Sequence, residues 1–304
     1  MRNTFAETLY ECAKADPKIY IVVADISPAG SMANFQREYP ERFLNVGVAE
    51  QSMIGIAAGL ALKGCRPFAY TIATFSLYRP FEMVRDDLCY QNLPVTVVGM
   101  GAGVIYSTLG GTHHTMEDIA IAGAMPNMQI IAPCDPLETI DATRHCATQD
   151  KGPVYLRIGK AGEPRLTENA VDPWSFGRIR YIRRGDDVCI LSYGVLMKMA
   201  AGVADTLEAQ GRSVSLVSCH TVKPLDRAGI EAALASHKHV IVIEENVPQG
   251  GLAAQTKQIA WDMRADCRLD TFTLQDEFIH NYGNHDQLLE AHGLSQEKIL
   301  AKVA

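Results

Sequence analysis

The sequence lacks the features that mark several specialised classes of protein. No apolar run reaches the roughly 18 to 20 residues of a membrane span, and the N-terminus, MRNTFAE, has no signal-peptide core. None of the eight cysteines forms a Cys-x-x-Cys pair, so neither a disulfide framework nor a structural zinc site is expected. The net charge of −7 disfavours nucleic acid and anionic membranes as partners. We therefore expect a cytoplasmic protein with reduced thiols and no metal site of its own.

Several catalytic motifs are absent too. The sequence holds no Gly-x-Ser-x-Gly elbow and no Walker lysine. Gly99, Gly101 and Gly103 follow a predicted strand, but no helix opens directly behind them. No acidic residue ends a second strand about 20 residues later, so the dinucleotide fingerprint is incomplete. The glycines instead predict a backbone that approaches a ligand closely.

What the sequence does contain is a regular alternation of helical and β-branched segments. The 304 residues, 47% hydrophobic and 21% charged, are enough for two globular domains. Near-continuous apolar strands separated by helices predict parallel sheets covered on both faces. We expect two doubly wound α/β domains, at 1–164 and 181–304, joined by a Pro- and Gly-containing linker at 165–180. Predicted strands are 19–24, 66–73, 95–98, 128–132, 153–158, 187–193, 213–218, 239–244 and 268–274; predicted helices are 3–15, 76–91, 117–124, 136–149, 195–210, 226–236, 250–263, 286–292 and 295–303.

The segment 43–64 organises the first domain. It predicts a short strand, a glycine turn, one carboxylate at Glu50 and a helix of small and apolar residues. Because that helix is apolar on every side, we expect it to be buried all round. A carboxylate at the mouth of such a helix is either a partner of the helix dipole or a carboxyl kept for chemistry.

Three further groups are candidates for a site. Phe75, Tyr78 and Phe81 recur every third residue, which predicts one aromatic face on the helix 76–91, either core or a stacking floor for a flat heterocycle. The glycine-rich loop delivers His113 and His114 to the carboxyl end of the sheet, where open α/β sheets bind ligands. Arg157, at the end of a strand, is suited to an oxyanion or to a structural ion pair.

Taken together, these motifs resemble the C-terminal part of transketolase over essentially the whole chain. The segment 46–51 is similar to the strand, turn and helix that supply the family's glutamate, here Glu50. The aromatic segment 74–81 resembles the one that packs around the aminopyrimidine of thiamine diphosphate, with Tyr78 at the stacking position. The run Gly111-Thr112-His113 matches the family's histidine motif.

The resemblance implies roles for individual residues. Glu50 would hydrogen-bond the pyrimidine ring and activate the cofactor, whose chemistry the protein tunes and positions. A buried, isolated carboxyl favours its protonated form, as this role requires. His113 would bind substrate hydroxyls and assist proton transfers. Arg2 and Arg157 correspond to substrate-phosphate arginines, and Asp25 falls at the acidic position near the diphosphate side of the site.

The resemblance also implies that the other half of the cofactor site lies in a second subunit. The Gly-Asp-Gly…Asn segment that holds the diphosphate and its divalent metal, Mg or Ca, is absent from the sequence. We therefore expect one subunit of a split transketolase that is inactive alone and pairs with an N-terminal subunit in a two-plus-two heterotetramer. The apolar helix after Glu50 would then form the seam with the partner.

Two positions depart from the family pattern. Leu109 replaces an aspartate that reads a substrate hydroxyl, and Ala29 stands near a serine that contacts phosphate. The implied reaction is transfer of a two-carbon ketol unit from a ketose, or ketose phosphate, to an aldose in carbohydrate metabolism. The alternatives are the β subunit of a 2-oxo acid dehydrogenase, an enzyme similar to deoxyxylulose-phosphate synthase, and a non-catalytic assembly subunit.

Overall fold

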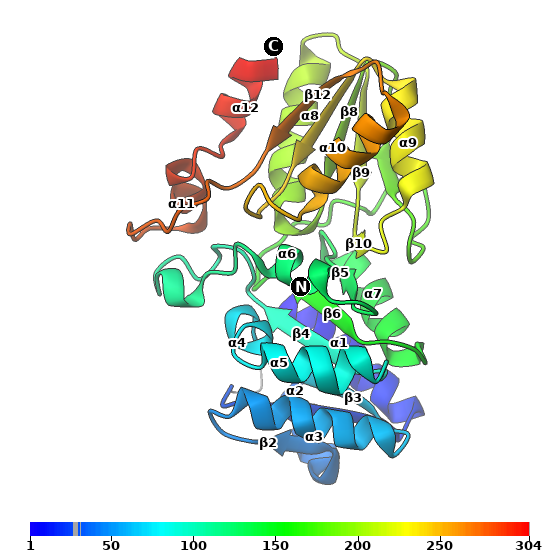
Figure 1. Ribbon diagram of the computed structural model, residues 1–304, viewed down its shortest axis with the longest axis vertical. Coiled ribbons are helices and arrows are strands. Elements are labelled where there is room, and N and C mark those ends of the chain that lie inside the picture. Colours follow the sequence, from blue (N-terminus) through cyan, green and yellow to red (C-terminus); the bar gives the residue numbers. More distant parts are fainter. Residues whose placement is uncertain (27–29, 31, 304) are drawn as a thin grey trace.

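Two mainly parallel sheets, one of seven strands and one of five, form the core of the protein. The computed structural model describes residues 1–26, 30 and 32–303, so Ala29 lies outside the described residues. The two sheets stack end to end along the long axis of the molecule (Figure 1). The prediction of two α/β units with parallel sheets is confirmed.

The first sheet is buried on both faces by helices. Its strands are β1 (Ile19–Val23), β2 (Phe43–Asn45), β3 (Arg66–Ile72), β4 (Thr96–Met100), β5 (Gln129–Ile131), β6 (Val154–Ile158) and β10 (Thr221–Lys223), in the order β10-β5-β6-β4-β3-β1-β2. Its helices are α1 (Arg2–Ala15), α2 (Met32–Glu38), α3 (Glu50–Leu62), α4 (Ala73–Leu77), α5 (Phe81–Met83), α6 (Asp118–Ala124) and α7 (Pro136–Thr148), with short 3-10 turns η1 (Pro40–Arg42) and η3 (Gly111–His113). Helices α1 and α7 pack on one face around Phe5, and α3 and α6 cover the other face around Met53.

The second sheet is built in the same way. Its strands are β7 (Arg180–Arg183), β8 (Val188–Ser192), β9 (Val214–Ser218), β11 (His239–Ile243) and β12 (Arg268–Phe272), in the order β12-β11-β8-β9-β7. Its helices are η4 (Gly194–Leu196), α8 (Met197–Ala209), α9 (Arg227–Ser236), α10 (Leu252–Met263), α11 (His285–Ala291) and α12 (Gln296–Val303). Helices α8, α11 and α12 pack on one face, and α9 and α10 cover the other.

Apart from 3-10 turns, two short strands and one short α-helix went unpredicted, and one of these strands joins the two halves. Strand β10 belongs to the second half of the sequence but pairs antiparallel with β5 of the first sheet. One hydrophobic cluster accordingly runs from α3 and α6 through Val222 to α9 and α10. Strand β7 and helix α2 were also missed, because each is short and carries little periodic signal.

Two expectations about helices are wrong. The helix predicted over 76–91 is interrupted after Leu77 and resumes as α5 and a π-helical turn, η2 (Val84–Tyr90). Helix α3 is not buried all round: Met53 and Ala57 face the sheet, whereas Ile56 and Leu62 are 40% and 62% exposed. After Gln51 and Ser52 in the first turn, the exposed side of α3 is an apolar surface, because residues 53–62 include no polar side chain.

No helix among the described residues is long and apolar enough to cross a membrane. The same part of the chain contains no cluster of three or more His, Cys, Asp or Glu side chains that could hold a metal ion. All eight cysteines are unpaired thiols, and five of them are buried.

Candidate functional site

The turn between β2 and α3 places Glu50 at the carboxyl edge of the first sheet. The side-chain oxygen of Asn45 accepts hydrogen bonds from the backbone N–H groups of Gly47, at 3.0 Å, and Asp25, at 3.2 Å. Gly47 has φ +69°, a conformation that favours glycine. The chain then enters α3 at Glu50, where the positive end of the helix dipole stabilises a carboxylate.

Glu50 is buried, with 2% of its surface exposed, but it is not isolated. The Nη1 atom of Arg79 donates to both carboxylate oxygens, at 3.0 and 2.9 Å. This ion pair corrects the expectation of an isolated carboxyl, because Arg79 contacts Glu50 through both of its oxygens. Arg79 was missed because it stands between the aromatic residues of its segment. Its side chain is 42% exposed, so the pair is open to solvent on one side.

Phe75 connects this ion pair to the glycine-rich loop. The guanidinium of Arg79 lies 4.8 Å from the centre of the Phe75 ring. On the loop side, the rings of Phe75 and His113 meet edge to face with centroids 5.2 Å apart. The structure thus brings together Glu50, Phe75 and His113, which the sequence predicted as one site, and adds Arg79 to them.

Tyr78 and Phe81 are less close to this group. The Tyr78 hydroxyl donates to Glu117 Oε2 at 2.7 Å, and the ring packs against the main hydrophobic core. Burial, with the charges of Asp118 and Glu117, holds the pKa of Tyr78 well above its ordinary value. Phe81 lies beyond the break in the helix and is 37% exposed. The three aromatic residues therefore do not form one continuous helical face.

The loop that carries His113 is shaped by glycines. Gly101 has φ +70°, and a Cβ there would lie 2.3 Å from the ring of Tyr106. Gly110, with φ +79°, precedes the 3-10 turn η3 that ends at His113. His113 faces Phe75 and Tyr106, whereas the neighbouring His114 is buried, and burial lowers its pKa. Of the two histidines, His113 is the one placed in the site.

Arg157 is held in a buried network at the junction of the two domains. Only 3% of its surface is exposed. Its Nε donates to Asp118 Oδ2 at 2.8 Å, and its Nη2 donates to the backbone oxygen of Glu245 at 3.1 Å. The guanidinium also lies 5.8 Å from the centre of the Tyr193 ring. The surroundings of Arg157 therefore fit a structural ion pair, the alternative left open by the sequence.

Two other cations are candidates for the substrate side, Lys160 over the Tyr106 ring and Arg2, whose charge acts on the same tyrosine. Lys160, just after β6, is exposed, and its Nζ lies 4.7 Å from the centre of the Tyr106 ring. That ring is in turn 6.1 Å from the His113 ring. Arg2 is half-buried, and its Nε is buried without a hydrogen-bond partner in the described part of the chain. Lys160 lies past the end of β6, whereas Arg157 lies inside this strand.

The two remaining predicted positions lie at the rim. Asp25 is exposed and has φ +44°, an uncommon conformation for a residue with a side chain. Strained backbone of this kind concentrates at functional sites. Leu109, which replaces the family aspartate, is 48% exposed and gives this part of the loop an apolar surface.

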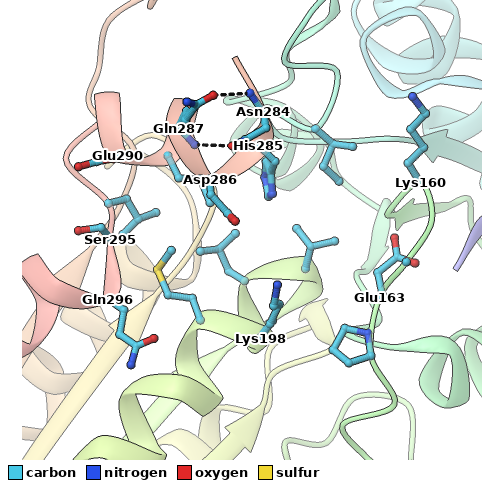
Figure 2. A pocket seen from close by; sticks show the side chains of 18 of the residues that line it. Lys160, Glu163, Lys198, Asn284, His285, Asp286, Gln287, Glu290, Ser295 and Gln296 are labelled. Carbon is cyan, nitrogen blue, oxygen red and sulfur yellow. Dashed lines mark hydrogen bonds between the residues drawn. The ribbon is translucent and has the colours of Figure 1, made fainter. Parts of the chain in front are cut away.

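A cavity of about 650 Å³ lies between the two domains. Lys160 and Glu163 face residues of α11, among them His285 and Asp286, across this cavity, and Lys198 closes it below (Figure 2). Neither Glu50 nor His113 is among the described residues that line it. The cavity therefore adjoins the predicted site through Lys160 and is separate from the Glu50 side.

Comparisons with known proteins identify the family of the chain. Residues 1–162 match the transketolase pyrimidine-binding domain and residues 177–299 match the transketolase C-terminal domain. The chain is 31% identical to a subunit of the apulose-4-phosphate transketolase of Phocaeicola vulgatus, over 98% of this chain and 94% of that protein. It is 32% identical to a 6-deoxy-6-sulfo-D-fructose transketolase subunit of a Clostridium species, over 99% and 92% of the two chains. Among solved structures, a split-gene transketolase in the form of an inactive beta4 tetramer superimposes with a TM-score of 0.87 at 31% identity, covering 99% of this chain and 95% of that one.

Proposed function

The chain belongs to the transketolase family, and from this we propose that it forms the pyrimidine-binding half of a split enzyme. The proposed reaction is transfer of a two-carbon ketol unit from a ketose to an aldose. Relatives of nearly the same length are transketolase subunits, so the chain is an enzyme subunit of the transferase class. The alternative of an enzyme similar to deoxyxylulose-phosphate synthase gains no separate support from the geometry of the site.

Members of this family depend on thiamine diphosphate, and the residues present fit its pyrimidine half. The observation that carries the proposal is the buried carboxylate of Glu50 at the start of α3. It pairs with Arg79, whose guanidinium lies over the Phe75 ring, and the same ring meets the ring of His113. A carboxyl group can donate its O–H in a hydrogen bond to a ring nitrogen, and an aromatic ring can pack against a flat heterocycle. When bound, the cofactor would supply the carbon nucleophile that attacks the ketose carbonyl.

The residues of this chain would then divide the work. Glu50 would hold the pyrimidine ring nitrogen, and Arg79 would fix the orientation of that carboxylate. Phe75 would pack against the ring, and Tyr78 and Phe81, further along the same segment, would complete its apolar surroundings and exclude water. Asp25, in its strained turn, would stand on the diphosphate side.

The substrate side would be formed by the glycine-rich loop and its cationic neighbours. His113 would donate hydrogen bonds to substrate hydroxyls and move protons at the reacting carbon. We assign the phosphate of a phosphorylated sugar to Arg2 and Lys160 in place of Arg157. Lys160 lies over the Tyr106 ring, the charge of Arg2 acts on the same tyrosine, and neither cation is enclosed in a buried ion pair. The buried Nε of Arg2, which lacks a partner among the described residues, supports an anion at this point.

The partner subunit would contact the exposed side of α3. Val48, Ile56 and Leu62 are 70%, 40% and 62% exposed on and before this helix, and so extensive an apolar surface is typical of an interface. The partner would carry the Gly-Asp-Gly…Asn segment and hold the diphosphate with Mg or Ca. A two-plus-two heterotetramer in the cytoplasm completes the proposal.

The proposal is tested by mixing this chain with an N-terminal transketolase subunit. The pair should transfer ketol units in a panel of ketose donors and aldose acceptors, both phosphorylated and free. The chain alone should be inactive, and we expect it to self-associate through the α3 surface, since its split-gene structural relative forms an inactive beta4 tetramer. Ketol transfer by the purified chain alone would refute the split-subunit proposal.

A further inference from the structure

The carboxylate of Glu245 reaches from the second domain into the glycine-rich loop of the first. Glu245 follows β11 and is 1% exposed. Its Oε1 accepts a hydrogen bond from the backbone N–H of Val104 at 2.8 Å. Gly103 has φ +73°, and a Cβ at this position would lie 2.1 Å from the carboxyl carbon of Glu245. The carboxylate thus occupies the space that any side chain at position 103 would need.

His285 keeps this carboxylate charged. The Nε2 atom of His285, the first residue of α11, lies 2.7 Å from the same Oε1. Burial alone would raise the pKa of Glu245, but the charge and hydrogen bond of His285, with the charge of Arg157, hold it below its ordinary value. Burial alone would lower the pKa of His285, and the Glu245 carboxylate more than offsets this, so the pKa is raised. An ion pair therefore holds the loop from the side of the second domain.

Both ends of the loop are held close to Glu245 by backbone hydrogen bonds. Gly103 donates its N–H to Thr115 Oγ1 at 2.7 Å and accepts from the Thr115 N–H at 2.9 Å. One residue later, the Met116 carbonyl accepts the N–H of Val247 at 2.9 Å. The loop from 103 to 115 therefore begins and ends against the segment that follows β11, and His113 lies inside it.

The same part of the second domain also covers the outer side of the loop. A Cβ at Gly110 would lie 3.5 Å from the Tyr282 ring, and one at Gly111 would lie 3.9 Å from the Phe278 ring. These two rings belong to the segment that leads into α11 and His285. The second domain therefore contacts the loop at its base, through Glu245, and again two to three residues before His113.

We propose that Glu245 is a positioning residue that holds the His113 loop from the second domain, with His285 as its charged partner. It touches neither substrate nor cofactor and acts through the backbone of Gly103 and Val104. The inference rests on the proposed function only in assuming that His113 works on the substrate. Its structural part, a loop held by a charged group, can be measured on this chain by itself.

Hydrogen–deuterium exchange of the full chain measures the loop directly. In Glu245→Gln, which keeps the shape but removes the charge, peptides covering 101–114 should exchange about tenfold faster. His285→Gln should change the same peptides in the same direction but less. His285 has a side chain that is 28% exposed, so this variant decides the question if Glu245→Gln fails to fold.

A matched control exists at the other end of β11. His239 and Asp270 form a second imidazole–carboxylate pair, with Nε2 and Oδ2 2.9 Å apart. His239→Gln removes a pair of the same type from the same domain and should leave exchange in 101–114 unchanged. Unchanged exchange in both Glu245→Gln and His285→Gln would overturn the proposal. An equal increase in His239→Gln would overturn it too.

Kinetics of the assembled enzyme give the second readout. A displaced His113 should lower kcat by about tenfold to a hundredfold in Glu245→Gln, while the Kd of thiamine diphosphate stays unchanged. Weaker cofactor binding with an unchanged kcat would overturn the positioning role. If the assembled wild-type pair transfers no ketol unit, the proposed function fails, and the exchange experiment still decides whether Glu245 holds the loop.

Discussion

Two arginine–carboxylate pairs in this protein have the same chemistry and different surroundings. Arg157 pairs with Asp118 at the domain junction, where the two side chains are 3% and 0% exposed. Arg79 pairs with Glu50 at the edge of the first sheet, where the carboxylate is buried and the arginine is 42% exposed. The first pair is almost completely sealed by protein, and the second is open to a ligand or a partner. An ion pair open on one side can exchange its partner, whereas a sealed one can only be broken.

The sealed pair should carry the largest stability effect. We expect Arg157→Met to lower the free energy of unfolding by about 3–5 kcal/mol, because it leaves the Asp118 carboxylate buried without a counter-charge. Urea denaturation of the isolated chain measures this. A loss below about 1 kcal/mol would mean that water reaches Asp118 and that the pair is not sealed.

Lys160 stands three residues after the buried Arg157 and is exposed, so it is the cation of this segment that a substrate can reach. We expect Lys160→Met to raise the KM for a phosphorylated substrate by about tenfold, the effect of one lost charge-assisted contact. The KM for the unphosphorylated sugar should stay the same, which serves as the control. Equal changes for both substrates would show that Lys160 does not read a phosphate.

The open pair should give the smallest stability effect. Arg79→Met, matched to the substitution at position 157, should cost about 1 kcal/mol, because water can replace a half-exposed guanidinium. The same urea titration compares the two variants under identical conditions. A loss as large as that of Arg157→Met would erase the distinction between an open and a sealed pair.

Much of the fold could be predicted because the sequence patterns that mark its strands and helices are local. Long apolar strands and periodic helices mark most elements of both domains. Strand β10 could not be predicted because it has three residues and its pairing with β5 crosses the domain boundary. The break after Leu77 was missed because the apolar periodicity continues through it. Tertiary packing decides such elements, and no local pattern records it.

The candidate site, too, has residues that local patterns predict and residues whose contacts only the tertiary structure reveals. Glu50, Phe75 and His113 could be predicted to lie together because all three follow strands of one parallel sheet. The roles of Arg157 and Lys160 could not be separated, because burial by the second domain is invisible in the sequence of one strand. The pairing of Arg79 with Glu50 was missed because it joins residues 29 positions apart, which no local pattern records.

The central claim is that Glu50 is a working carboxylate of the cofactor site, and Glu50→Gln tests it most directly. In the assembled enzyme we expect ketol transfer to fall by about a hundredfold or more, the scale of a lost acid–base group. The assembly, measured by analytical ultracentrifugation, should be unchanged. Near-normal ketol transfer by an intact Glu50→Gln assembly would contradict the account.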